Sequence, residues 1–366
     1  MKNLRVIFLS QWINNPYSNL LASHLSSKEV QVEESRQKRS IFFPTGSIFF
    51  PLVIWQEKPD ILHLHLFRPF IISRNQLFRW IRLFVFISQV FILKLLGTKT
   101  VWTVHEWHDK FNFDKISIPP QHTAIIGKFI DAIIAHSHTV KQEITKAFSL
   151  ENQNKVFVVP HGNYIDIYEN KVSKLEARKA LGIPTENVVF LLFGNIYRYK
   201  GVLEAIDAFK YLPQDGISLL IAGQPKPDRL EELIKDKIQG AKNIILVPER
   251  VLDDEVQIYL NASDCVLLPY QVFTTSGAAI LAMSFGRACI APRVGFFSDV
   301  LDDSGAILYD STDEKGLLQA MKCAIDKKNQ LLDMGNYNLK VAEKWNWDYV
   351  AEETYNIYQK LSDSLR

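Results

Sequence analysis

Two cationic side chains follow an apolar run in the middle of the chain. The run Val188–Phe193 ends at Gly194, and a helix-like pattern starts at Val202. Between them lie Arg198 and Lys200. A continuous apolar run is typical of a buried parallel strand, and a glycine lets the backbone turn tightly at its end. Because a helix N-terminus already favours anions, this segment predicts a diphosphate site. The alternative is a pair of solvated cations on a surface loop.

A second candidate anion site lies between Tyr270 and the helix-like stretch that follows it. Thr275 and Ser276 are residue types that cap helix N-termini, and Gly277 would let a ligand approach the free N–H groups of the helix. Two such sites in one domain are more specific than either alone. Neither forms a G-x-G-x-x-G pattern, so the sequence gives poor support to a dinucleotide-dependent redox enzyme.

Histidine, which can hold or move a proton near neutral pH, occurs only in the first part of the chain. All nine histidines lie at or before His161. His105 is the first polar residue after the strand-like Thr100–Val104, so we predict that it faces the ligand as a catalytic residue. Hydrogen bonding to a ligand hydroxyl, or to a backbone group, are the alternatives for His105.

Four other residues of the first half are predicted to lie on the acceptor side of the site. Asn15 and Tyr17 belong to a turn signal after the first strand, and His161 closes the last strand of this half. His65 alternates with His63 on one strand face. These two histidines suggest a metal pair, but no third ligand has a matching spacing, so core or cleft-wall histidines are favoured.

The elements that must position these residues alternate between strand and helix. Strands are predicted in the first half at Leu4–Leu9, Ile61–His65, Thr100–Val104, Ala132–Ala135 and Val156–Val159. Helix-like stretches separate them, which indicates βαβ units and a parallel sheet. We assign residues 1–165 to this N-terminal, acceptor-binding domain. The polar stretch Tyr164–Lys174 has the composition of an interdomain linker.

A second alternation predicts a second Rossmann-like domain over residues 175–340, which the family resemblance described below makes the nucleotide-sugar-binding domain. Its strands are predicted at Val188–Phe193, Ser218–Ala222, Asn243–Val247, Cys265–Leu268 and Ala288–Ala291. Ligands of doubly wound sheets bind outside the carboxyl ends of the strands. Those ends carry Gly194, Gly223, Gln224, Glu249, Arg250 and Tyr270. Two Rossmann-like domains of this kind, facing one another, would enclose a cleft.

Length and composition agree with a two-domain globular protein. At 366 residues the chain exceeds the size at which single cores stop growing. A net charge of +2 argues against a dedicated nucleic-acid binder. The three widely spaced cysteines form neither a disulfide framework nor a zinc pattern, and suit a reducing cytoplasm. The short apolar run near the N-terminus lacks a cleavage site, so a signal peptide is not expected.

The segment 77–96 resembles a membrane element. It is rich in Phe, Ile, Leu and Val but contains Arg79, Arg82 and Lys94. Three cations argue against a spanning helix. The segment is therefore expected either to lie in the bilayer interface or to be a buried helix with its arginines reaching outward.

Five sequence motifs together resemble one known family. They are Phe193–Gly201, Pro269–Gly277, Leu281–Ala291, Pro160–Gly162 and Trp345–Trp347. With these the chain resembles a GT-B-fold glycosyltransferase of group one, the family-four type, over essentially its whole length. The resemblance implies an α/β fold of two Rossmann-like domains facing a central cleft. It also implies that a closing helix in residues 341–366 crosses back to the N-terminal domain.

The resemblance implies transfer of a sugar from a nucleotide-sugar donor to an acceptor. The donor diphosphate would be bound by Arg198, Lys200, Thr275, Ser276 and Gly277. The donor nucleoside would lie near Gly194, Gly223, Gln224, Glu249, Arg250, Val251 and Tyr270. His105 would contact the transferred sugar. No metal or other cofactor is expected, because cations and N–H donors can stabilise the departing diphosphate and the chain has no Asp-x-Asp motif.

The chain also departs from the family pattern. Phe273 and Leu281 occupy the places of two glutamates that are usually seven residues apart, one of which normally holds the donor ribose. The commoner arginine positions of the phosphate loop hold Asn195 or Tyr197. The chain resembles a subset with a Ser-Gly loop, often tied to polysaccharide or lipid-linked oligosaccharide assembly.

We therefore predict a metal-independent glycosyltransferase of the cytoplasm, or of the inner face of a membrane that it contacts through 77–96. Its acceptor would be a glycan or a lipid-linked molecule. A non-catalytic partner subunit of another transferase is the main alternative, motivated by the missing glutamates. A sugar-nucleotide epimerase and a nicotinamide oxidoreductase are further alternatives.

Overall fold

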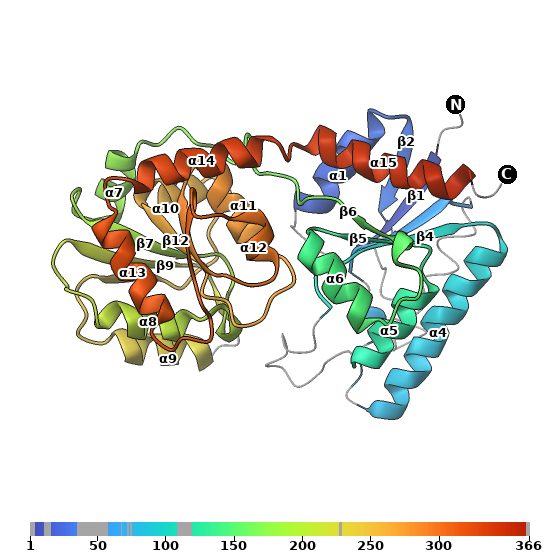
Figure 1. Cartoon of the computed structure of the whole chain (residues 1–366), viewed down its shortest axis with the longest axis horizontal. Helices are drawn as coiled ribbons and strands as arrows, with labels where there is room; N and C mark the ends of the chain where they lie inside the picture. The colour runs from blue at the N-terminus through green and yellow to red at the C-terminus, as the bar shows by residue number, and fades with distance from the viewer. Residues whose placement is uncertain are drawn as a thin grey trace. The chain divides into compact units, whose positions relative to one another are not determined.

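The computed structural model describes residues 4–10, 16–34, 58–66, 68–71, 73, 75–107, 119–226 and 229–363. The chain divides into two units (Figure 1). Unit 1 comprises residues 1–162 and 346–366, and unit 2 comprises residues 163–345. The divisions therefore follow Gly162 and Trp345, whereas the sequence placed domain boundaries after residues 165 and 340.

The described strands of unit 1 form one parallel sheet in the order β2-β1-β3-β4-β5-β6. They are β1 (Leu4–Leu9), β2 (Val30–Glu34), β3 (Ile61–Leu64), β4 (Lys99–Thr103), β5 (Ala132–Ala135) and β6 (Val156–Val158). The helices are α1 (Pro16–Ser26), α3 (Arg68–Ile71), α4 (Gln76–Leu95), α5 (Pro120–Phe129), α6 (His138–Ala147) and α15 (Trp347–Asp363), with the 3₁₀ turn η2 (Gln153–Lys155). The parallel order brings the carboxyl ends of all these strands to one edge.

The last helix of the chain completes the core of unit 1. Trp347 and Tyr358 of α15 are buried in one apolar cluster with Phe8 of β1. Gly162 lies so close to the Trp347 ring that a Cβ atom there would overlap it. A glycine is required at this position because the indole fills the space where a side chain would be.

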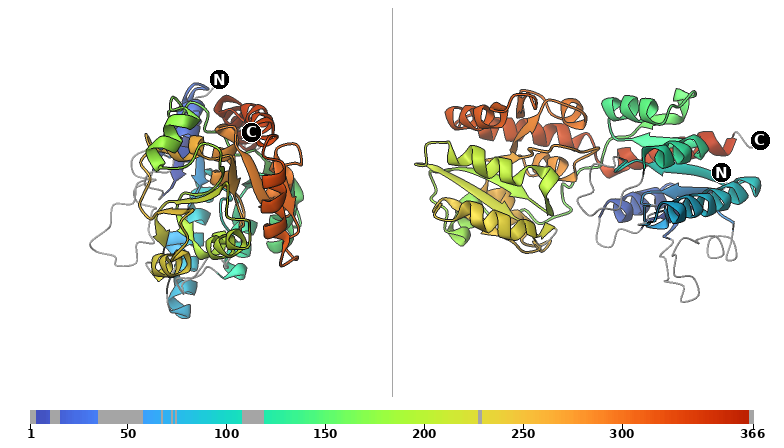
Figure 2. Two further views of the ribbon diagram at one scale, coloured as in Figure 1. Left: turned by 90° about the vertical axis from the view of Figure 1, so that its left-hand side faces the viewer. Right: turned by 90° about the horizontal axis from the view of Figure 1, so that it is seen from below.

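The described strands of unit 2 form a second parallel sheet in the order β11-β9-β7-β12-β13-β14, beside a two-stranded pair, β10-β8 (Figure 2). The strands are β7 (Val188–Phe193), β8 (Ile196–Tyr197), β9 (Ile217–Ala222), β10 (Pro225–Lys226), β11 (Ile244–Val247), β12 (Cys265–Leu267), β13 (Ala288–Pro292) and β14 (Ala306–Tyr309). The helices are α7 (Lys174–Leu181), α8 (Val202–Lys210), α9 (Arg229–Ile238), α10 (Val256–Ala262), α11 (Gly277–Ser284), α12 (Phe296–Val300), α13 (Gly316–Asp326) and α14 (Leu331–Glu343), with the 3₁₀ turn η3 (Arg198–Lys200).

A buried charge pair joins elements at the amino end of this second sheet. Arg178 of α7 is buried, and its guanidinium donates to the Asp264 carboxylate at 2.7 Å and to the Ala262 carbonyl at 3.0 Å. The same carboxylate accepts the N–H of Val189 at 2.7 Å. Burial is tolerated because both charges are paired and hydrogen-bonded. This network lies at the opposite end of the strands from the predicted ligand site.

Candidate functional site

Two glycines end neighbouring strands of unit 2 in direct contact. Gly194 follows β7 with φ +90°, and Gly223 follows β9 with φ +141°. The Gly194 N–H donates to the Ala222 carbonyl at 2.9 Å. A Cβ atom on Gly223 would overlap the carbonyl oxygen of Gly194. Because both positions have positive φ and one of them has no space for a side chain, only glycine suits this crossing.

Arg198 and Lys200 lie in the single turn η3, which leads into α8. Gly201 joins the two elements at φ +71°, and a Cβ atom there would overlap the Pro269 carbonyl oxygen. Arg198 is exposed and Lys200 is half-buried. The Lys200 ammonium lies 5.6 Å from the centroid of the Tyr270 ring, within the range of a cation–π contact.

The turn η3 is hydrogen-bonded to the loop after β12, which carries the second predicted anion site. The Gln271 N–H donates to the Tyr199 carbonyl at 2.8 Å, and the Gln271 amide donates to Glu204 of α8 at 2.8 Å. Two segments about 70 residues apart in sequence are thus joined at one edge of unit 2. The structure brings Lys200 and Tyr270 together.

Helix α11 begins at the second anion site. Ser276 is its N-cap, and the Ser276 hydroxyl accepts the Ala279 N–H at 3.2 Å. Gly277 opens the helix, and a Cβ atom there would lie 3.3 Å from the Tyr164 hydroxyl. Thr275 is half-buried, and the hydroxyl of its neighbour Thr274 is buried without a hydrogen-bond partner in the described part of the chain. The Ser276 hydroxyl therefore caps one of the N–H groups at the start of this helix.

Aromatic rings surround Phe273, one of the two positions at which the sequence resemblance leads us to expect a glutamate. Phe273 packs on Phe297 with ring centroids 4.4 Å apart, and on Tyr270 at 6.0 Å. Leu281, at the second glutamate position, is buried within α11. Neither side chain can accept a hydrogen bond from a ribose hydroxyl, so any such contact has to come from other groups.

The remaining predicted nucleoside residues follow β9 and β11. Gln224 is exposed, and its carbonyl accepts the Ile196 N–H at 2.9 Å. Glu249 and Arg250 are exposed and Val251 is half-buried, just beyond the end of β11. Since β11, β9, β7 and β12 are successive parallel strands, these residues share the edge that carries Gly194 and Tyr270.

Histidines gather around Tyr17 at the carboxyl edge of unit 1. The centroid of the Tyr17 ring lies 5.8 Å from that of His65, 4.7 Å from His105, 5.6 Å from His136 and 5.0 Å from His161. His65 follows β3, His105 follows β4, His136 follows β5 and His161 follows β6. All five side chains are buried. Asn15, predicted on the same side, lies outside the described residues.

Hydrogen bonds fix the roles of several of these rings. His63 uses both nitrogens within the fold, with Tyr358 Oη at 2.6 Å and Thr103 Oγ1 at 2.7 Å. His136 Nδ1 lies 2.9 Å from the Val159 carbonyl and His161 Nδ1 lies 2.8 Å from the Gly162 carbonyl. Since a carbonyl only accepts, these two Nδ1 atoms carry the protons. His63 is thus a satisfied core histidine.

Burial keeps the histidine cluster neutral at pH 7. Loss of hydration lowers the pKa of His65 and His136 to about 3 and the pKa of His161 to about 4. Burial and the other histidines lower the pKa of His105 well below its ordinary value. A neutral His105 can exchange hydrogen bonds with a hydroxyl but is not a cationic acid. Among the described residues no group of three or more His, Cys, Asp and Glu side chains could hold a metal ion.

His136 was missed by the sequence reasoning. It directly follows the apolar stretch Ala132–Ala135, just as His105 follows a strand, so the same rule would have found it. Its ring lies 5.2 Å from the His105 ring and 5.3 Å from the His161 ring. The position after each strand, rather than the motif alone, identifies the cluster.

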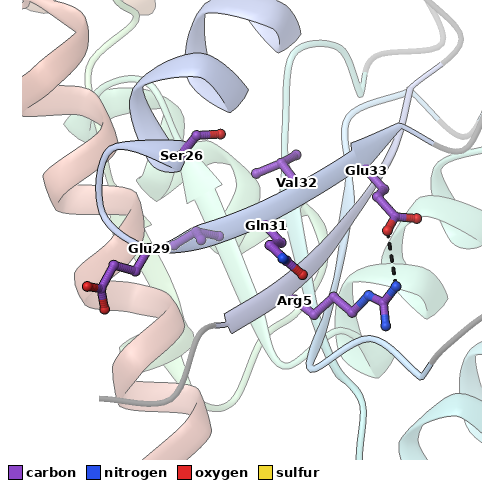
Figure 3. A pocket seen from close by; sticks show the side chains of 7 residues that line it. Arg5, Ser26, Glu29, Gln31, Val32 and Glu33 are labelled. Atoms are coloured by element: carbon purple, nitrogen blue, oxygen red, sulfur yellow. Dashed lines mark hydrogen bonds and ion pairs between the residues drawn. The ribbon is translucent and has the colours of Figure 1, made fainter.

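A polar hollow lies along the edge strand β2 of the unit 1 sheet (Figure 3). Its lining includes Arg5, Glu29, Gln31 and Glu33, and the Arg5 guanidinium pairs with the Glu33 carboxylate at 3.1 Å. Arg5 lies near the start of β1, and Glu29 precedes β2. The hollow therefore lies beside the edge strand, and its lining shares no residue with the histidine cluster.

Comparisons with known proteins find a family model, relatives and solved structures that match this chain. Residues 173–341 match the family model described as glycosyl transferases group 1. This part of unit 2 is thus similar to the group 1 glycosyltransferases. The chain is 24% identical to a D-inositol 3-phosphate glycosyltransferase of Corynebacterium urealyticum over 63% of its own length, and 26% identical to a lipopolysaccharide 1,2-N-acetylglucosaminetransferase of Salmonella typhimurium over 58%. It spans only 57% and 59% of the length of these two relatives.

Solved structures match over nearly the whole chain. A sucrose-phosphate synthase from Thermosynechococcus elongatus has a TM-score of 0.75 at 15% identity, covering 99% of this chain and 100% of that one. The Anabaena protein HepE, solved in complex with UDP and glucose, has a TM-score of 0.71 at 14% identity, with 99% of each chain covered. At these identities the likeness shows the fold. The predicted GT-B fold and the resemblance to group-one glycosyltransferases are therefore confirmed.

Proposed function

We propose that this protein transfers a sugar from a nucleotide-sugar donor to a glycan or lipid-linked acceptor. The observation that carries the proposal is the joining of η3 to the loop after β12, which gathers Lys200, Tyr270 and the start of α11 at one edge of unit 2. Names of relatives support it, since the matched proteins include glycosyltransferases and a structure with bound UDP and glucose.

The donor would bind to unit 2. Arg198 and Lys200 would neutralise the diphosphate, and Thr275, Ser276 and Gly277 would add hydroxyl and N–H donors at the start of α11. As the bond to the sugar breaks, negative charge grows on the diphosphate, and preorganised cations and N–H groups stabilise that charge. The nucleoside would lie along Gly194, Gly223, Gln224, Glu249, Arg250, Val251 and Tyr270.

The acceptor would bind to unit 1 near Asn15, Tyr17, His65 and His161. His105 would act at the transferred sugar as a neutral imidazole that hydrogen-bonds a hydroxyl. The neutral, buried character of this cluster supports an uncharged polyhydroxyl ligand over an anion.

The proposal includes no metal and no other cofactor, because Arg198 and Lys200 supply the positive charge that a divalent ion would otherwise provide. The protein would be located in the cytoplasm and would make peripheral contact with the membrane through residues 77–96. Such contact would bring a lipid-linked acceptor to the enzyme.

A thermal-shift panel tests the donor site. The panel comprises UDP, GDP, ADP, their common sugar conjugates and NAD(H), each with and without EDTA. We expect one nucleoside diphosphate to raise the melting temperature of the wild type and of Lys322→Ala, an exposed lysine of α13, but not of Lys200→Ala. A shift that needs a divalent ion would contradict metal independence, and a shift with NAD(H) alone would favour the oxidoreductase.

A second candidate function is a non-catalytic subunit that binds a nucleotide sugar for another transferase. The packing of Phe273 on Phe297 favours it, because the usual carboxylate is replaced by apolar contacts. The experiment is a donor-hydrolysis and transfer assay on the protein alone and with candidate partners. Activity that appears only with a partner, and survives Lys200→Ala, would support the subunit and contradict catalysis by this chain.

A further inference from the structure

One helix of unit 1 has an exposed apolar face along its whole length. Leu77, Ile81, Phe84, Phe91 and Leu95 lie three, four or seven residues apart, so they share one side of α4. All are exposed, and the exposed fraction reaches 72% at Phe84 and 70% at Leu95. Phe78, Trp80 and Ile92 widen the face. Such a continuous apolar surface marks an interaction site.

The opposite side of α4 is already used by the fold. Leu83, Phe86, Val90 and Leu93 are buried within unit 1. Lys94 near the end of the helix pairs with Asp131 at 2.8 Å and donates to the Phe129 carbonyl at 2.8 Å. Within the described part of the chain, α4 is the one helix long and apolar enough to cross a bilayer. Spanning would strip four apolar side chains from the core and break the Lys94 contacts.

Helices α4 and α5 carry positive charge beside this face. Helix α4 carries the half-buried Arg79 and Arg82, its neighbour α5 carries the exposed Lys128, and Lys94 of α4 is already paired with Asp131. Neither helix contains an Asp or a Glu. Trp80, whose ring lies 4.3 Å from that of His122 on α5, is a residue type enriched at membrane–water interfaces. Figure 1 shows α4 along the outside of unit 1, with α5 next to it.

We propose that α4 docks unit 1 on an anionic lipid bilayer and lies in the plane of one leaflet, with Phe84 and Leu95 inserted. An amphipathic helix of this kind binds through buried apolar area together with attraction to anionic headgroups. A second copy of the chain on this face would bring two cationic helix pairs together, so the bilayer is the better occupant. This inference specifies the membrane contact of the proposed function but does not require catalysis.

Vesicle flotation of the full chain tests the docking. The vesicles are phosphatidylcholine alone, and phosphatidylcholine with phosphatidylglycerol. We expect binding to the anionic vesicles that weakens as salt rises. The double variant Phe84→Glu/Leu95→Glu should bind about tenfold less. Its matched control, Leu175→Glu/Leu332→Glu, changes two side chains of unit 2 that are 63% and 67% exposed and should bind like the wild type.

Several outcomes would overturn the proposal. The first is that the protein binds neutral vesicles as well as anionic ones. The second is that both double variants lose vesicle binding to the same extent. The third is that the protein stays on the vesicles after an alkaline carbonate wash, which would indicate that it spans the bilayer. A dimer in light scattering that the Phe84→Glu/Leu95→Glu variant abolishes would assign the face to a second copy. A nucleotide-induced thermal shift in that variant, as in wild type, would separate failed docking from a failed donor site.

Discussion

Four histidines follow the strands of unit 1, whereas glycines and two cations follow the strands of unit 2. His65, His105, His136 and His161 are buried and neutral around Tyr17. Arg198 and Lys200 remain at least partly exposed, beside backbone that only glycine can form. One parallel-sheet architecture thus gives two edges of opposite character. The residues that follow the strands, and not the sheets themselves, give the two edges these different characters.

Acid should distinguish the two units most strongly. The histidine pKa values lie near 3 to 4 in folded unit 1 but near 6.5 in an unfolded chain. Below pH 6.5 the unfolded state therefore binds more protons than the folded state. The stability that the neutral histidines allow is complete above that pH, and it falls as the pH drops toward 4. For each such histidine, the free energy of unfolding falls by up to about 1.4 kcal/mol for each pH unit of acidification.

Hydrogen exchange read by mass spectrometry between pH 7 and pH 4, corrected for the intrinsic exchange rate, checks this expectation. Peptides of unit 1 should lose protection first, because unit 2 contains no histidine. Simultaneous loss of protection in both units would contradict the assignment of acid sensitivity to the cluster.

The glycine crossing of unit 2 should be the most sensitive position of that edge. Gly223→Ala would place a methyl group on the Gly194 carbonyl oxygen at a φ that L-residues rarely adopt. Strain and overlap together should cost about 4 kcal/mol of the free energy of unfolding. Urea denaturation measures it. Gly182→Ala, at φ +66° with open space around it, is the control and should cost about 1 kcal/mol. Equal losses would remove the steric argument.

Charge at the same edge should matter for rate more than for folding. If the ammonium contacts the leaving diphosphate, Lys200→Ala should remove roughly 2–4 kcal/mol of transition-state stabilisation and lower kcat/KM accordingly. Steady-state kinetics with the donor found by thermal shift gives the value, with Lys322→Ala as the control. Near-normal turnover in Lys200→Ala would leave unit 2 without its proposed anion site.

The smallest expected effect concerns the N-cap of α11. Ser276→Ala and Ser173→Ala each remove a helix cap of unit 2, and each should cost about 1 kcal/mol of stability. Only Ser276→Ala should also weaken nucleotide binding, because α11 begins at the proposed phosphate site and α7 does not. Calorimetric titration with the nucleoside diphosphate makes this comparison. Equal affinities would place the phosphates elsewhere.

Buried strands could be predicted well from the sequence, and exposed ones could not. Val188–Phe193 and Ala132–Ala135 are continuous apolar runs, and both strands have the predicted bounds. The edge strand β2 (Val30–Glu34) alternates apolar with polar residues over a short length, and β14 is a four-residue edge strand. Strand β2 has no continuous apolar run, whereas β14 has one as long as Ala132–Ala135 and was overlooked.

The site could be predicted in its parts but not in its contacts. Gly194, Lys200 and Ser276 are visible as local signals before or at a helix start. The bond from Gln271 to Tyr199, and the Lys200–Tyr270 contact, join segments that no spacing connects. Likewise the Tyr17 ring meets four histidines from four strands, and only the strand order β1-β3-β4-β5-β6 brings them together.

The docking of α15 in unit 1 has a consequence for the order in which the protein can fold during synthesis. Trp347 packs beside Gly162, and the Tyr358 hydroxyl is hydrogen-bonded to His63. Both residues leave the ribosome only after all of unit 2. Until then the nascent first unit exposes the apolar surface that these rings later cover. Unit 2 is continuous in sequence and can close its core beforehand. The unit whose translation begins first is therefore the one that finishes folding last.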